Sequence, residues 1–495
     1  MGKNRLSRWW FLRAGGAAVL GVSSGWDAKP LTPPNAPDVL GRRPQSSKGG
    51  SAMANLRIGI ACVDYTPELG LPLMGNFRDD YGARGVHEPL YARALVFQDS
   101  AGTKLALMSV DICMVDRDNA ALMRHFIASQ TDLRPENIII AATHTHSGPA
   151  PMNLGSLPKA DDAAIERFLT KAATAAVVAN QQLKPSRLTF GTTQERRLSF
   201  NRRLRCKDGK THMNWEGLDP EFVLEPLGPI DPQVINLTVE QEGRPVAAVV
   251  NFALHPAILA GDNWLYSADY PGYLAESLSR LTGDGFLTAF FNGCCANVNH
   301  VDYSDRTQGR GYPMAQRVGY MLGVAADEAR KRAVPVEGNG LVLSSEKVRL
   351  KRLKISEEQC RWSEEVVRKA KESPARGQVD GLPDEHYART WLEMRQKQEA
   401  DDFVEVNALR IGDLGIVALP GEVFCEFGLE IKKQSPAKHT IVFELANDYI
   451  GYLPTREAFS QGGYEPTPGT TLYEEGAGEK ITDSAIRQLY RLFPQ

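Results

Sequence analysis

The chain has 495 residues, of which 42% are hydrophobic and 24% are charged, and its formal net charge is −3 at pH 7. This composition is typical of a globular protein that buries a sizeable core. The absence of a long basic run after residue 50 argues against a nucleic-acid partner. No run approaches the roughly 20 uninterrupted apolar residues of a membrane-spanning helix.

The first 52 residues differ in kind from the rest. A basic head precedes a modest apolar stretch at 17–22. The segment 7–13 resembles a twin-arginine export signal in which Trp9 replaces the second arginine, without a clear A-x-A-like cleavage site. Residues 27–52, rich in Pro, Ser, Gly and Arg, are expected to be a disordered linker. Two alternatives stay open: export to the periplasm or the medium, which the basic head favours, and a cytoplasmic protein whose translation starts at Met53.

From residue 56 onward, short apolar runs alternate with amphipathic ones. A helix is expected at 116–129, and strands are expected at 56–63, 91–97, 104–112 and 137–143. Because a helix between two strands is a crossover connection, the strands at 104–112 and 137–143 should be parallel.

The second half of the chain continues this alternation. Further helices are expected at 162–182, 271–281, 313–333 and 425–434, and further strands at 286–291, 341–350 and 440–445. Hairpins are expected at 234–254 and at 404–419. The charged segment 355–400 has helical periodicity and predicts a helical insertion on the surface. The fold class that follows is α/β, with layered mixed β-sheets flanked by helices, in a single large domain at 53–495.

The seven cysteines are odd in number and form no C-x-x-C pair. Several of them lie in apolar runs that are predicted to be strands. This pattern indicates small buried thiols rather than a disulfide framework.

Polar motifs follow the ends of four predicted strands. His144 and His146 lie in Thr-His-Thr-His-Ser-Gly-Pro, and residues two apart on a strand face the same way. Two imidazoles on one face suit a metal. A histidine pair without a metal would also explain the motif, so an H-x-H by itself is weak evidence.

The other three motifs are His255-Pro256, Pro-Gly-Glu422 and the segment Tyr449-Ile-Gly-Tyr452. Each has an ordinary structural alternative: a packed histidine, a carboxylate at a helix N-terminus, or tyrosines that pack with a polar tip. Enzyme sites gather outside strand ends. Two imidazoles and a carboxylate suit zinc, whose open position lowers the pKa of bound water to about 7. Spacing alone does not single out Tyr452 as a ligand.

In this order, the motifs resemble the N-terminal catalytic domain of the neutral/alkaline non-lysosomal ceramidases. The resemblance runs from about residue 58 to about residue 465 and includes Asp-Tyr-Thr-Pro at 64–67, the stretch 85–94 and Ser-Val-Asp-Ile at 109–112. The Thr-His-Thr-His-Ser-Gly-Pro block is its most specific element. The resemblance implies one zinc ion with four ligands, which are His144, His255, Glu422 and Tyr452. It also implies that Arg202 is an active-site arginine and that His146 lines the pocket.

Two features depart from the family pattern. The family's Gly-Asp-Val-Ser segment, whose serine is required for activity, aligns with Ala-Asn-Val-Asn at 296–299, which puts Asn299 in place of the serine. Ceramidases also carry a C-terminal immunoglobulin-like domain, and the chain ends too soon after Tyr452 for a domain of about 100 residues. Both departures argue against ceramide itself as the substrate. Cys294 or Cys295 could be considered as a replacement nucleophile, but adjacent cysteines after a buried strand are more often packing residues.

The residues and the resemblance together predict a zinc-dependent hydrolase of an amide (N-acyl) bond in a small-molecule or lipid-like substrate. His146 or Asp111 would accept a proton or orient a ligand imidazole, and Arg202 or Asn299 would stabilise the oxyanion. Two alternatives stay open. The chain could be a zinc hydrolase of an ester or carbohydrate-derived substrate, or a non-catalytic module that a metal stabilises. The oligomeric state is left open.

Overall fold

The computed structural model describes residues 56–494, except for 79, 155–156 and 371–382. The predicted signal-like segment and linker at 1–52, with the alternative start at Met53, lie outside the described residues. Within the described part, no helix is both long and apolar enough to cross a membrane.

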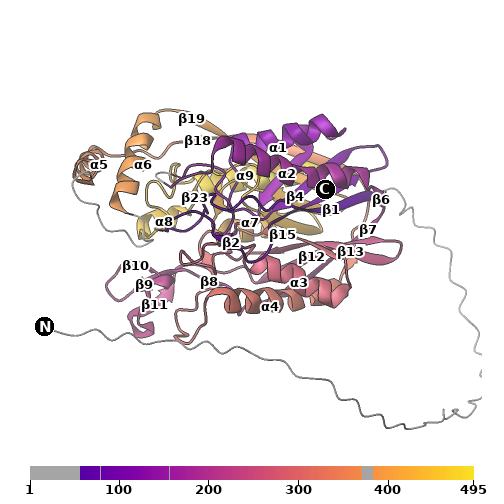
Figure 1. Ribbon diagram of the computed structural model, residues 1–495, viewed down its shortest axis with the longest axis horizontal. Coiled ribbons are helices and arrows are strands. Elements are labelled where there is room, and N and C mark those ends of the chain that lie inside the picture. The colour runs from indigo at the N-terminus through magenta and orange to yellow at the C-terminus, as the bar shows by residue number, and fades with distance from the viewer. Residues whose placement is uncertain (1–55, 79, 155–156, 371–382, 495) are drawn as a thin grey trace, which may run out of the picture. The chain divides into compact units, whose positions relative to one another are not determined.

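The first of three large sheets in the described part has the strand order β5-β4-β3-β1-β6 (Figure 1). The β4–β5 pair is parallel, as the crossover helix α1 (Arg117–Gln130) predicts, and the other pairs are antiparallel. The strands are β1 (Arg57–Asp64), β3 (Tyr91–Gln98), β4 (Lys104–Val110), β5 (Ile138–Ala142) and β6 (Lys184–Pro185).

The second and third sheets follow the same plan. Their orders are β15-β13-β12-β7-β17 and β18-β19-β20-β22, and each has one parallel pair, β13–β15 and β20–β22. The second sheet consists of β7 (Arg187–Gln194), β12 (Gln233–Gln241), β13 (Arg244–Phe252), β15 (Leu287–Asn292) and β17 (Val334–Pro335). The third consists of β18 (Leu341–Lys351), β19 (Asp401–Ile411), β20 (Leu414–Ala418) and β22 (His439–Phe443).

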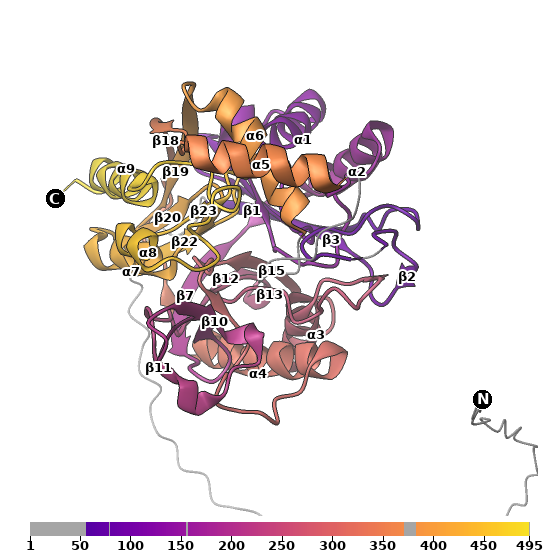
Figure 2. The ribbon, with the colours of Figure 1, turned by 90° about the vertical axis from the view of Figure 1, so that its left-hand side faces the viewer.

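Side chains alternate between two faces of each sheet. In β3, Leu95 and Phe97 pack into a core shared by all three sheets, whereas Ala94 and Val96 pack beneath helices. The three sheets therefore enclose one common core, and helix pairs cover their outer faces (Figure 2). The pairs are α1 with α2 (Asp162–Gln181), α3 (Tyr270–Thr282) with α4 (Gly311–Lys331), and α7 (Cys425–Gln434) with α9 (Ala477–Leu492). The predicted fold class, mixed sheets flanked by helices, is confirmed.

The charged segment 355–400 holds two helices, α5 (Glu357–Ala370) and α6 (Asp384–Lys397), which pack against each other. The rings of Trp362 and Trp391 lie 4.8 Å apart between centroids. The indole N–H of Trp391 donates to the carbonyl of Pro468 at 2.6 Å, which holds α6 against the C-terminal loops.

Short strands and helices complete the described chain. The two-stranded pairs are β2 (Gly85–Val86) with β14 (Leu265–Tyr266), β8 (Phe200–Asn201) with β16 (Val298–Asn299), and β21 (Glu422–Val423) with β23 (Tyr452–Leu453). A small sheet joins β9 (Arg203–Cys206), β10 (Thr211–Met213) and β11 (Val223–Pro226), and α8 is Arg456–Gln461. Single 3-10 turns occur at Pro135–Asn137, Asn214–Glu216 and Pro220–Phe222.

Gly59 of β1 lets α2 approach its sheet closely, because a Cβ atom there would lie 1.8 Å from the carbonyl oxygen of Ala179. We expect Gly59→Ala to lower the free energy of unfolding by about 3 kcal/mol, since the helix must move away from the strand. Gly340→Ala is the matched control, because a Cβ atom at Gly340 meets open space. Urea denaturation measures the free energy of unfolding of both variants. Equal unfolding midpoints would contradict the close approach of α2 to β1 at Gly59.

Candidate metal centre and active site

Each of the three sheets sends a polar side chain to one point beyond its strand ends. His144 lies two residues after β5, and His255 three residues after β13. Glu422 and Tyr452 follow the third sheet and begin β21 and β23, where they are paired in parallel register. His144 has a φ of +73°, an uncommon conformation for a residue with a side chain, and its backbone N–H is held by the carbonyl of Ile112 at 2.9 Å.

The donor atoms of His144, His255 and Glu422 all lie within 4.8 Å of one another. The Nε2 atoms of His144 and His255 are 3.0 Å apart, and Glu422 Oε2 is 3.4 Å from the first and 3.7 Å from the second. The three side chains are at most 3% exposed. This is a compact, buried donor set from three distant parts of the chain.

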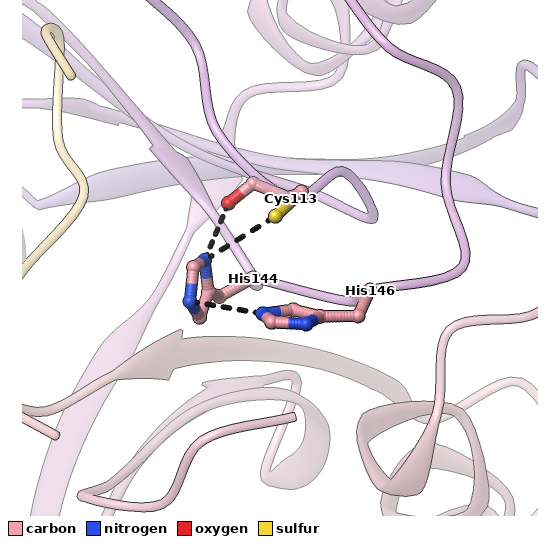
Figure 3. Close-up of side chains that lie close together, drawn as sticks. All are labelled: Cys113, His144 and His146. Atoms are coloured by element: carbon pink, nitrogen blue, oxygen red, sulfur yellow. Dashed lines mark hydrogen bonds between the residues drawn. The ribbon is translucent and has the colours of Figure 1, made fainter. Parts of the chain in front are cut away.

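The hydrogen bond behind His144 orients the lone pair of its Nε2 toward the other donor atoms. His144 Nδ1 donates to the carbonyl of Cys113 at 2.7 Å (Figure 3), which leaves the lone pair on Nε2. His255 Nδ1 lies 3.6 Å from Cys295 Sγ, and Glu422 Oε2 has no hydrogen-bond partner within the described chain. The Nε2 lone pair of His144 thus faces His255 Nε2 and a carboxylate oxygen without a hydrogen-bond partner among the described residues, in a buried space. The residues present therefore fit a metal cation, and zinc accepts this donor chemistry.

The pKa shifts support the same reading. Burial lowers the pKa of His255 well below its usual value, and the neighbouring His144 lowers it further. Burial raises the pKa of Glu422, but His144 and the hydroxyl of Tyr452 outweigh this effect and the pKa is lowered. Burial also lowers the pKa of His144, yet Cys113 and Glu422 raise it more, to well above its usual range. The pKa shifts of His144 and Glu422 therefore show that these two side chains interact strongly.

A second group of candidate donors, Cys113, His144 and His146, lies beside the first (Figure 3). His144 Nδ1 is 3.7 Å from the Cys113 sulfur but only 2.7 Å from its carbonyl oxygen. Because this nitrogen carries the proton that the carbonyl accepts, it is not free to bind a metal. The set with His255 and Glu422 is therefore the better cation site.

Tyr452 and Arg202 stand next to the donor set. The Arg202 guanidinium lies 5.3 Å from the centre of the Tyr452 ring. Burial raises the pKa of Tyr452 well above its usual value, Glu422 adds to the rise, and Arg202 opposes it. Arg202 Nε donates to Glu465 at 2.8 Å, whereas its Nη2 has no partner within the described residues. Arg202 therefore presents an unused, buried N–H donor.

A cavity of about 410 Å³ opens onto these residues. His146, Arg202 and Asn299, all predicted from sequence, line it together with His144, His255, Glu422 and Tyr452. The apolar part of its wall comes from Phe77, Met114, Leu154, Leu157, Ala257, Ile258, Ala260 and Val301. The described residues of α5 and α6 are not among those that line it.

His146 and Asn299 are held in place by their own hydrogen bonds. His146 Nε2 lies 3.3 Å from His144 Nε2, and its Nδ1 lies 3.4 Å from Asn76 Oδ1. Asn299 exchanges two hydrogen bonds with Asn214, at 2.7 and 2.8 Å, and its oxygen also accepts from the backbone of Val301. The Asn299 oxygen is thus occupied, and one N–H of its amide is left for a ligand.

Asp111 is not brought to the cavity. Its carboxylate accepts from Arg93 at 2.8 Å and from the backbone N–H of Tyr91 at 2.9 Å, and it is not among the described lining residues. The group that accepts the proton of His144 Nδ1 is instead the carbonyl of Cys113. The Asp111 carboxylate thus holds Arg93 and the backbone of Tyr91 rather than a ligand imidazole.

We expect Asp111→Asn to lower the free energy of unfolding by about 3–5 kcal/mol, because the buried guanidinium of Arg93 loses its counter-charge. Zinc content and kcat should stay close to wild type at temperatures where the variant is folded. The double variant Arg93→Met, Asp111→Leu should recover most of the stability in denaturant titrations. A large fall in kcat at unchanged stability would show that Asp111 takes part in catalysis.

Several site residues were not predicted. Cys113 lines the cavity, and the Tyr449 hydroxyl donates to Glu422 Oε1 at 3.1 Å. Glu444 accepts from the backbone N–H groups of Cys295 and Val423 at 3.0 and 2.7 Å, and so ties the loops beside His255 and Glu422 together. Burial raises the pKa of Glu444 to about 8. A lone glutamate inside the apolar run Ile-Val-Phe-Glu-Leu was the available signal.

Comparison with known proteins agrees with this architecture. The chain is 24% identical over 506 aligned residues to the neutral ceramidase of Pseudomonas aeruginosa, in a match that covers 88% of this chain and 71% of that protein. It is 22% identical over 496 residues to the neutral ceramidase of Mycobacterium tuberculosis, covering 84% and 74% respectively. The match to neutral ceramidase A of Dictyostelium discoideum, 26% identical over 278 residues, covers 52% of this chain and 37% of the relative.

The fold is also similar to a solved one. The crystal structure of neutral ceramidase from Pseudomonas aeruginosa superposes with a TM-score of 0.70 at 20% identity, covering 89% of this chain and 75% of that one. The sequence model of the family described as neutral/alkaline non-lysosomal ceramidase, N-terminal, matches residues 56–398, more than half of the chain. The protein belongs to the neutral/alkaline non-lysosomal ceramidase family, a family of hydrolases.

Proposed function

We propose that this protein is a zinc-dependent hydrolase that cleaves an N-acyl amide bond. The observation that carries the proposal is the convergence of His144, His255 and Glu422, whose donor atoms all lie within 4.8 Å of one another beside a cavity of about 410 Å³. Tyr452, paired with Glu422 across β21 and β23, is the fourth proposed ligand. One zinc ion held there would lower the pKa of a bound water and polarise a carbonyl oxygen.

The residues of the chain supply the other requirements of the reaction. Burial lowers the pKa of His146 well below its usual value, and the neighbouring His144 lowers it further, so its ring is neutral and can accept a proton from water. Arg202 Nη2, which is unpartnered within the described chain, can donate to the carbonyl oxygen as negative charge develops there. In the overall reaction the C–N bond breaks, the hydroxyl of water joins the acyl carbon, and a proton goes to the amine.

The proposal of an amide substrate rests on the relatives, which are named neutral ceramidases, and on the apolar part of the cavity wall. Asn299 lacks a hydroxyl, and Cys294 and Cys295 are buried, with pKa values that burial, and then Glu444, raise well above the usual range. A water nucleophile is therefore the chemistry that these side chains support best. Ester and carbohydrate-derived substrates on the same scaffold are the second candidate, which the departure at Asn299 favours.

The test combines metal analysis with a substrate panel. Elemental analysis of the purified chain should find about one zinc ion per chain. A panel of N-acyl amides, matched acyl esters and N-acetylated sugars then distinguishes the bond types, and cleavage of the amides should be the fastest. A chain without metal, even after incubation with zinc, would exclude the mechanism. Bound zinc with turnover of esters or sugars alone would move the function to the second candidate.

A further inference from the structure

Of the two guanidinium groups among the described residues that line the cavity, Arg202 is paired with the buried Glu465, whereas Arg310 has no role in the hydrolysis of an uncharged amide. The described lining residues also include one carboxylate, Glu422, which belongs to the metal site. Burial lowers the pKa of His300, a further lining residue, to about 4, so its ring is a neutral hydrogen-bonding group.

Arg310 is an exposed cation without a partner in the described part of the chain. Its side chain makes no hydrogen bond or ion pair there, whereas Arg306 in the same loop pairs with Asp219 at 3.1 Å. Arg310 lines the cavity instead. His300 Nδ1 is also buried without a partner among these residues. Both groups are free to bind a ligand.

The N-terminus of α4 adds to the positive potential at the same place. Arg310 is the N-cap residue of this 21-residue helix, and its first turn contains no acidic residue. Among the described residues, no side chain caps the free N–H groups of this helix. A helix N-terminus carries about half a positive charge, and its first N–H groups seek an acceptor. Within the described chain, the N-terminus of α4 therefore lacks a capping side chain at the residue, Arg310, that lines the cavity.

We propose that the substrate of this site is an N-acyl amide that carries a carboxylate on its amine part. Arg310, His300 and the N-terminus of α4 bind this carboxylate. A carboxylate is opposite in charge to a guanidinium and accepts two hydrogen bonds at the spacing of its N–H groups. The apolar lining at Phe77, Met114 and Leu154 comes from other segments than the cationic lining and takes the acyl chain. This inference rests on the proposed function and narrows its substrate class.

The experiment compares N-decanoylglycine with N-decanoylethanolamine, which share the acyl chain and the amide and differ in the carboxylate. We expect wild-type kcat/KM to be at least about tenfold higher for the glycine conjugate, and the preference to fall with rising ionic strength. Arg310→Gln should remove most of this preference, by raising KM for the glycine conjugate far more than KM for the ethanolamide. Arg306→Gln is the matched control, since this arginine does not line the cavity, and should keep the preference.

Equal rates for the two compounds in the wild type, or an unchanged preference in Arg310→Gln, would overturn the inference while the amidase function stands. If neither compound is cleaved, calorimetric titration of the zinc-loaded protein with both compounds separates the two proposals. Tighter binding of the glycine conjugate in wild type and in Arg306→Gln, but not in Arg310→Gln, would uphold the anion site without the amidase function. The inference would also be overturned if the preference for the glycine conjugate were absent, or the same, in all three proteins. Carboxylate binding to the metal alone would be the same in the three proteins.

Discussion

His144→Ala and Glu422→Gln proteins are expected to lose their zinc and at least about 10³-fold of kcat/KM. Each change removes one of three donors that lie within 4.8 Å of one another, and an incomplete donor set neither holds the metal at low concentration nor places it against the substrate. Elemental analysis and steady-state kinetics on the same preparations measure both effects. His125→Ala is the control, because that histidine is exposed on α1 and does not line the cavity.

Added zinc should restore little of the lost activity. In Glu422→Gln the two imidazoles remain, so weak binding at high zinc is expected without the rate of the wild type. Full zinc content in either variant, at wild-type stability, would mean that the metal is held elsewhere. The neighbouring group formed by Cys113, His144 and His146 would then be the first place to look, with Cys113→Ser as the test.

The sequence predicted the layers of the fold because alternation and turn signals are local. The strands at 104–112 and 137–143 with their crossover helix are present as a parallel pair, and the helix predicted at 425–434 has these bounds in α7. The closure of three sheets around one core was not predicted, because it depends on which faces meet, and Leu95 and Ala94 look equally apolar in the sequence. The amphipathic helix α9 was missed although Ile481, Ala485 and Leu489 repeat at helical spacing.

The candidate site was predicted from the positions of polar residues rather than from the alternation of apolar ones. Polar residues at strand ends identified His144, His255 and Glu422 as a group, since the strand ends of a layered sheet converge. The groups that support them could not be found in this way. The acceptor for His144 is a backbone carbonyl, which has no sequence signature, and Glu444 acts through two backbone N–H groups from separate loops.

Arg202→Gln is expected to lower kcat by about 10²–10³-fold with zinc content unchanged and KM little affected. Its Nη2 is a buried donor without a partner in the described chain, and a donor that meets negative charge only in the transition state acts on kcat. Arg203→Gln is a close control. Arg202 and Arg203 share the buried Glu465, at 2.8 and 2.7 Å, but Arg203 does not line the cavity.

Both changes remove one bond to Glu465, which should lower the free energy of unfolding by about 1–3 kcal/mol. Arg203→Gln should cost more than Arg202→Gln, because Arg203 also donates to the carbonyl of Gly462 at 2.8 Å. Only Arg202→Gln should lower the rate at a temperature where both proteins are folded. An equal loss of rate in the two variants would make Arg202 a structural residue whose contact with Glu465 shapes the pocket. Bound zinc in the wild type without turnover of any amide or ester would instead identify the protein as a metal-stabilised binding module. In that case the unpartnered donor of Arg202 would be a contact for a ligand that is held and not cleaved.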